Sequence, residues 1–155
     1  MGRFFRLRAL REELGQSLIE LALLLPILVF GLIGGADLAR AYALQLAVQN
    51  GARAGAEAYA VNQSPSPQLA IDRAKDEMGR TPGFTKDAFG RVIAPVTVTI
   101  AAADGVSSCT VSPPTVADPC FVTVNVQYTF KTIIPWPLIP NTANFNRETT
   151  MRIFY

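Results

Sequence analysis

Residues Leu21 to Ala36 form an apolar run without any charged residue. Extended back to Leu18, the run contains one charged residue, Glu20. A helix needs about 20 predominantly apolar residues to cross the hydrocarbon core of a bilayer. Pro26 lies inside the run, but neighbouring helices in a membrane can compensate for the backbone hydrogen bond that a proline removes. The run therefore predicts a membrane-spanning helix.

The segment before the run, residues 1–15, is a short basic leader. Its charged residues are Arg3, Arg6, Arg8, Arg11, Glu12 and Glu13. Positive charge close to a spanning helix stays on the cytoplasmic side, which predicts a cytoplasmic N-terminus and an exported C-terminal part. The chain carries a formal net charge of +2, and the leader accounts for all of it. The exported part is therefore neutral, and we expect no nucleic-acid partner.

The helix is expected to continue out of the membrane to Ala60, so that residues 16–60 form one element. Residues 37–60 are rich in alanine and contain no proline, which favours a helix. Residues three or four positions apart define its expected packing face: Leu38, Tyr42, Gln45, Val48, Ala52, Gly55 and Tyr59.

Two pairs of glycines in this helix have the spacing that allows another helix to approach closely: Gly31 with Gly35, and Gly51 with Gly55. Glycines are also common in spanning helices without such a role, and the sequence alone does not separate these explanations for the pair in the span.

Residues 61–155 are expected to form one small exported domain of mixed helix and sheet. Ser66 as the N-cap and Pro67 in the first turn predict a second helix from 67 to 78. Its expected buried positions are Leu69, Ile71, Ala74 and Met78.

Alternating apolar and polar residues predict three strands. These are a strand around residues 96–100, a strand from Phe121 to Lys131, and a last strand from Arg147 to Tyr155. Prolines exclude residues 133–140 from the sheet; Trp136 there is either a contact residue or part of a loop tucked under the sheet edge. The fold class is therefore α+β, with a long N-terminal helix, a short second helix and a small antiparallel sheet covered by the helices.

Cys109 and Cys120 are the two cysteines of the chain. Disulfides persist in exported domains, so we expect these residues to be bonded to each other, with two free thiols as the alternative.

The chemistry of an enzyme is missing from the sequence. There is no histidine, and two cysteines without histidine cannot build a zinc site. Nucleophile-elbow, phosphate-loop and dinucleotide motifs are also missing. Asp76 and Glu77 are adjacent on a predicted helix and point in different directions. We therefore expect neither enzymatic activity nor a metal or other cofactor.

Glu20 is the residue that a simple membrane anchor would not contain. A carboxylate inside a spanning helix costs about 2.5 to 3.5 kcal/mol at the centre of the bilayer and less near its surface. Two explanations remain open on physical grounds. Either a partner compensates the charge, or the membrane begins at Leu21 and Glu20 lies in water.

The residues around Glu20 resemble a known family. A basic leader ending in Gly15, then Gln16 and Glu20 before a long apolar helix, looks like the cleavage signature of type IV pilin precursors. More closely, G-Q-S-L-I-E-L-A-L-L-L-P-I-L, G-L-I-G-G-A-D-L-A-R-A-Y and A-V-Q-N-G-A-R-A-G-A resemble the TadE-like minor pilins and pseudopilins of tight-adherence (Flp/Tad) pilus systems. One departure is Leu21, where the major pilins of these systems often have tyrosine, and this favours a minor component.

The resemblance implies a role for each matched residue. A prepilin peptidase would cut after Gly15 and free the amine of Gln16. Glu20 would pair with the N-terminal amine of a neighbouring subunit, and the paired glycines at 31 and 35 and at 51 and 55 would permit tight contacts between subunits. The implied partners are the bacterial inner membrane, the peptidase and other pilin subunits, with the protein either in that membrane or in the adhesive or secretion filament.

Two other interpretations remain. The first 36 residues could be a secretory signal with small residues, Gly34 to Ala36, at its cleavage site, although the apolar core of such signals is shorter. The chain could also be an uncleaved single-pass protein that uses its outer domain for binding.

Overall fold

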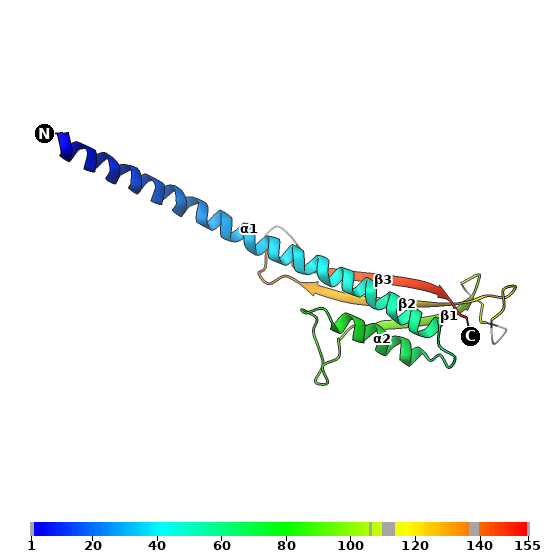
Figure 1. The fold of residues 1–155 in the computed structure, drawn as a ribbon. Coiled ribbons are helices and arrows are strands. Elements are labelled where there is room, and N and C mark those ends of the chain that lie inside the picture. Colours follow the sequence, from blue (N-terminus) through cyan, green and yellow to red (C-terminus); the bar gives the residue numbers. More distant parts are fainter. Residues whose placement is uncertain (1, 106, 110–113, 137–139, 155) are drawn as a thin grey trace. The chain divides into compact units, whose positions relative to one another are not determined.

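The computed structural model describes residues 2–105, 107–109, 114–136 and 140–154, with side chains from Gln16 onward. The elements follow in the order α1, α2, β1, β2, β3 (Figure 1). The chain divides into two compact units, Met1–Ala39 and Arg40–Tyr155. The boundary lies inside α1, so the last third of this helix, from Arg40 to Ala60, is part of the folded domain.

Helix α1 runs without a break from Gly2 to Ala60 and contains Pro26. The predicted leader, span and exported extension are therefore helical along the whole of their described backbone. The packing face predicted for the exported part is confirmed from Val48 to Tyr59 but is wrong at Leu38 and Tyr42. Leu38 and Tyr42 are 73% and 70% exposed. On a 3.6-residue period, Tyr42 lies about a third of a turn away from the face that Val48 occupies. The residues buried on α1 are Asp37, Leu44, Ala47, Val48, Gly51, Ala52, Gly55, Ala56, Tyr59 and Ala60.

Helix α2 spans Pro67–Gly79, with Ser66 as its N-cap and Pro67 in the first turn. The Ser66 hydroxyl accepts a hydrogen bond of 3.2 Å from the Leu69 backbone N–H, which satisfies one of the free donors at the helix start. The predicted buried face needs a correction. Ala70 is buried together with the expected Ala74 and Met78, because a small residue is required where α2 approaches α1. Leu69 and Ile71 are only half-buried.

The three strands form one antiparallel sheet in the order β1-β2-β3. Strand β1 spans Val96–Ala102, β2 spans Cys120–Lys131 and β3 spans Thr142–Arg152. Strand β3 begins five residues before the predicted start at Arg147 and ends before Tyr155, which lies outside the described residues. Its pairing with β2 explains the earlier start, since Thr142 pairs with Lys131 and the two strands remain in register back to Phe121. The described residues of the predicted proline-rich connection, 133–136 and 140, lie outside the strands.

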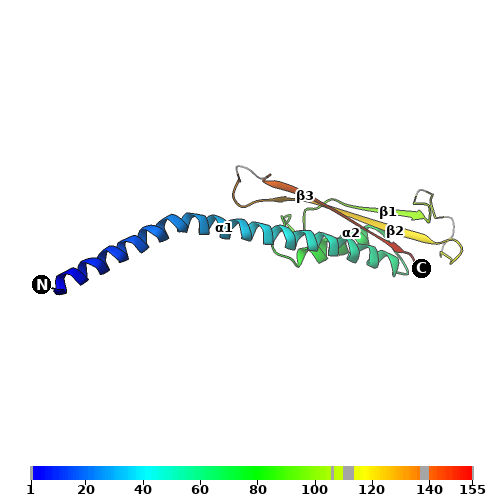
Figure 2. The same ribbon diagram turned by 90° about the horizontal axis from the view of Figure 1, so that it is seen from above.

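The core lies between one face of the sheet and the two helices that cover it, α2 and the part of α1 that follows Arg40 (Figures 1 and 2). Val122, Val124 and Val126 of β2 have 0% exposure and alternate with polar residues that face outward, as the period-two pattern predicts. At the end of β3, Phe154 donates a backbone hydrogen bond of 3.0 Å to the Ala60 carbonyl. This bond ties the C-terminal segment to the end of α1.

Candidate assembly helix

The first half of α1 exposes an almost unbroken apolar surface. All residues from Gln16 to Leu32 are exposed, including Leu23 at 70%, Ile27 at 68% and Leu32 at 75%. Burial of one such side chain is worth about 1.5–3 kcal/mol. The helix from Gln16 is long and apolar enough to cross a membrane. This surface is therefore suited to lipid or to other apolar helices.

Gln16 and Glu20 lie one turn apart at the start of this surface. The Gln16 side-chain amide donates a hydrogen bond of 3.1 Å from Nε2 to Oε1 of Glu20. Both side chains are exposed. The contact joins the first residue after the predicted cleavage point to the carboxylate for which the family resemblance implies an amine partner. Gly15, the predicted last residue of the leader, lies within α1 next to Gln16.

The two glycine pairs differ in their surroundings. At Gly31 and Gly35, an added methyl group would meet nothing within 4 Å. These two residues lie one turn apart on α1 with open space beside them, where a second helix could approach closely. No packing partner for this pair is present within the described chain, so its assignment to contacts between subunits stays a prediction.

Gly51 and Gly55 already pack within the chain. A Cβ at Gly51 would lie 3.0 Å from the Ala74 carbonyl oxygen, and a Cβ at Gly55 would lie 2.8 Å from the Ala70 carbonyl oxygen. The second pair thus lets the backbones of α1 and α2 approach each other, and its partner in the structure is α2 rather than another subunit. The sequence held a signal for this contact, because Ala70, Ala74 and Met78 repeat every four residues and form a matching narrow stripe.

Arg40 is a residue that the sequence analysis did not single out. Its guanidinium carbon lies 5.6 Å from the centroid of the Phe130 ring at the end of β2, a distance typical of cation–π contacts. Phe130 itself is 4% exposed. The contact attaches the first turn of the folded domain to its sheet, and no sequence pattern predicts it because the partners are far apart along the chain.

Cys109 and Cys120 form a disulfide with a Cα–Cα distance of 5.8 Å. Cys120 is the first residue of β2 and is 3% exposed. The bond therefore fastens the irregular connection between β1 and β2 to the edge of the core.

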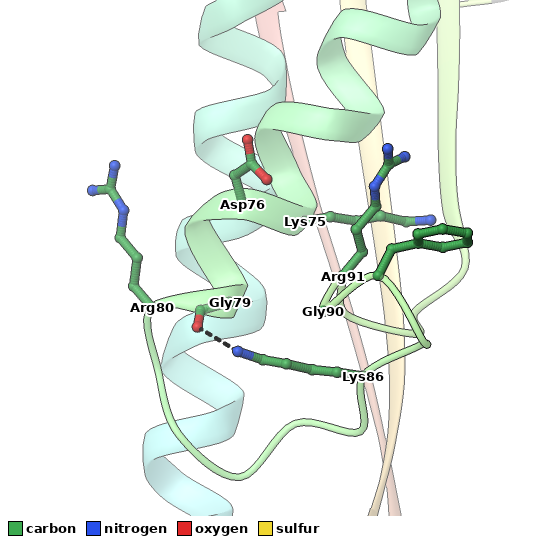
Figure 3. Close-up of a pocket in the computed structure, with 8 residues that line it drawn as sticks. Lys75, Asp76, Gly79, Arg80, Lys86, Gly90 and Arg91 are labelled. Carbon is green, nitrogen blue, oxygen red and sulfur yellow. Dashed lines mark hydrogen bonds between the residues drawn. The ribbon is translucent and has the colours of Figure 1, made fainter.

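An open hollow beside the C-terminal end of α2 is lined mainly by charged residues (Figure 3). Its charged lining residues are Lys75, Asp76, Arg80, Lys86 and Arg91. Local contacts engage two of these cations: Lys86 Nζ donates a hydrogen bond of 3.2 Å to the Gly79 carbonyl, and Arg80 lies 3.1 Å from Glu77. Among the described residues, no group of three or more histidine, cysteine or acidic side chains is placed to hold a metal ion.

A comparison with known protein families finds a match to most of α1. The family model described as TadE-like protein matches residues 15–57. Comparisons with curated proteins and with solved structures gave no significant match. The matched segment contains Gln16, Glu20 and both glycine pairs, and it ends just before the end of α1. This match, together with the long apolar helix, supports a membrane-anchored, pilin-like protein. The chain therefore carries a TadE-like segment over residues 15–57, and the resemblance found in its sequence is confirmed.

Proposed function

We propose that this protein is a minor pilin or pseudopilin that helps to assemble a tight-adherence pilus, and that a prepilin peptidase cuts it after Gly15. The observation that carries the proposal is the composition of α1. From Gln16 to Leu32 it exposes large apolar side chains with one carboxylate, Glu20, near their start, and from Arg40 it is built into a folded domain. A helix of this kind can anchor the precursor in the membrane and later pack among other helices.

Glu20 has the central role in this proposal. A carboxylate surrounded by lipid or by apolar helices needs a partner of opposite charge or several hydrogen bonds. The hydrogen bond from Gln16 supplies one neutral donor. After cleavage, the new α-amine of Gln16 would supply the positive charge, and in an assembly of parallel helices the amine of one subunit reaches Glu20 of the next.

The orientation of the precursor follows from the charges at its N-terminus. The arginines of residues 1–15 remain in the cytoplasm, so the peptidase would act on the cytoplasmic side of the inner membrane. The domain that begins at Arg40 would lie outside the cytoplasm, where a disulfide such as Cys109–Cys120 is stable. The proposed partners are the peptidase and the N-terminal helices of other pilin subunits.

The N-terminal sequence and intact mass of the protein purified from membranes of its native host test the processing step. A chain that begins at Gln16 supports the proposal. A chain that begins at Asp37 would identify a secretory signal and an exported soluble domain. A chain that retains Met1 would identify an uncleaved anchor, and pairing between the amine of Gln16 and Glu20 would then be impossible.

The role of Glu20 in assembly needs a separate test. We expect Glu20→Ala to be cut normally and to lose most of its co-purification with other pilin subunits, because the amine then lacks its anion. Glu57→Ala is a matched control, since Glu57 lies on an exposed face of the same helix within the folded domain. If both variants co-purify with pilins as well as the unaltered protein does, the proposed pairing role of Glu20 is wrong. If the unaltered protein itself does not co-purify with pilins, the alternative is favoured: a single-pass anchored binding domain that is not part of a filament.

A further inference from the structure

The hydrogen bond between Gln16 and Glu20 has a chemical consequence if Gln16 becomes the N-terminal residue, as the proposed function requires. In the uncut chain the Gln16 nitrogen belongs to a peptide bond and is not a nucleophile. Cleavage after Gly15 would create a free α-amine on the same residue that carries the side-chain amide. These two groups can react with each other, because their closure gives an unstrained five-membered ring.

The reaction balances without an oxidant or any other reactant. The neutral α-amine attacks Cδ of the Gln16 side chain and forms a new amide bond. The bond between Cδ and Nε2 breaks, and Nε2 leaves as ammonia with the proton lost by the amine. The product is a lactam, 5-oxoproline, which has neither a basic amine nor a side-chain amide. Such a chain end could neither neutralise Glu20 nor donate the Nε2 hydrogen bond to it.

The hydrogen bond to Glu20 opposes this closure. Nε2 of Gln16 lies 3.1 Å from Oε1 of Glu20, one helical turn toward the C-terminus. To reach its own α-nitrogen, the same side chain must turn back toward the N-terminus. A conformer that holds the hydrogen bond therefore cannot close the ring. The hydrogen bond to a carboxylate is also stronger than a bond to a neutral acceptor.

We propose that Glu20 protects the mature N-terminus from cyclisation by holding the Gln16 side-chain amide away from the α-amine. Glu20 is then a positioning residue for the chain end as well as an anion for the amine. The two effects act together, because the amine is available for pairing only as long as the lactam has not formed. This inference depends on the proposed cleavage after Gly15, but its chemistry can be tested separately.

The test uses the full chain with residues 1–15 replaced by the recognition sequence of a site-specific protease that cuts directly before Gln16. The protein is purified in detergent and cut, and the mass of its N-terminal peptide is followed over time for the loss of one ammonia. We compare the unaltered residue 20 with Glu20→Gln and Glu20→Ala. Neither variant has a charge at position 20, but the glutamine keeps a carbonyl acceptor that can hold the Gln16 amide.

We expect the lactam to form about threefold to tenfold faster in Glu20→Ala than with Glu20, as for the loss of one typical intramolecular hydrogen bond. Glu20→Gln should fall between these two rates. The control variant Gln16→Asn should show no loss of ammonia by this route, because the shorter asparagine side chain would have to close a strained four-membered ring.

Two results would overturn the inference. Equal rates with Glu20 and with alanine would show that the hydrogen bond does not protect the chain end. Equal rates in Glu20→Gln and Glu20→Ala would show that any protection comes from charge rather than from the held side chain. A native protein that retains Met1 would instead overturn the proposed processing, and this result is distinct from both because the protease supplies the cut in the test.

Discussion

Substitution of Gly55 by alanine tests the packing of α1 on α2 at its closest point. The added Cβ would lie 2.8 Å from the Ala70 carbonyl oxygen, 3.1 Å from the Ala74 Cβ and 3.2 Å from Val124 Cγ1. The first of these atoms belongs to the backbone of α2, so it cannot move by a change of rotamer. To accept one methyl group, α2 must shift away from α1 and from the sheet.

Two opposing effects set the size of the change. Overpacking of a well-filled core costs about 1–3 kcal/mol. Replacement of glycine by alanine inside a helix contributes about 0.8–1 kcal/mol in the opposite direction. Gly79→Ala is a matched control on α2, because the nearest atom to its added Cβ is Val92 Cγ2 at an ordinary 3.8 Å. We therefore expect Gly55→Ala to be less stable than Gly79→Ala by about 1–3 kcal/mol.

Denaturant unfolding of the full chain in detergent, followed by near-ultraviolet circular dichroism, measures this difference. Near-ultraviolet signals report the packing of aromatic residues in the folded domain and not the helix content of the membrane segment. A Gly55→Ala protein that equals or exceeds Gly79→Ala in its free energy of unfolding would contradict the close contact between α1 and α2.

The same unfolding assay checks three other predictions. Met78→Ala should lower the free energy of unfolding by about 2–5 kcal/mol, because Met78 has 0% exposure and its truncation leaves a cavity. Reduction of the disulfide between Cys109 and Cys120 should lower it by about 3 kcal/mol, the loop-entropy value for a loop of this size; an unchanged midpoint in reductant would contradict this. Ser66→Ala should cost about 1 kcal/mol through loss of the N-cap bond to Leu69, whereas the exposed Ser64→Ala should cost little.

The features that the sequence predicted well depend on local interactions. The start of α2 follows from Ser66 and Pro67, which act within one turn. The burial of β2 follows from strict alternation, since Val122, Val124 and Val126 must share one face of any strand. The length and apolar character of the first half of α1 likewise predict its exposure, because a small domain could not bury so long an apolar helix.

The features that the sequence predicted poorly depend on contacts between distant segments. The early start of β3 at Thr142 is decided by its pairing with Lys131 and not by its own alternation. The burial of Leu44 instead of Tyr42 is decided by the direction from which the sheet approaches α1. The spacing of Gly51 and Gly55 correctly indicated a close helix contact, but spacing alone cannot show whether the partner belongs to the same chain.

The size of the side chains along α1 limits where other subunits can bind. From Ala47 onward the buried face consists mainly of alanine and glycine, and α2 and the sheet already occupy it. A helix of another subunit could reach that face only by displacing α2, which would expose Met78 and the core valines of β2 to water. Gly31 and Gly35 have open space around them. Close contacts between neighbouring helices in an assembly should therefore involve the first half of α1, the same segment that carries Glu20.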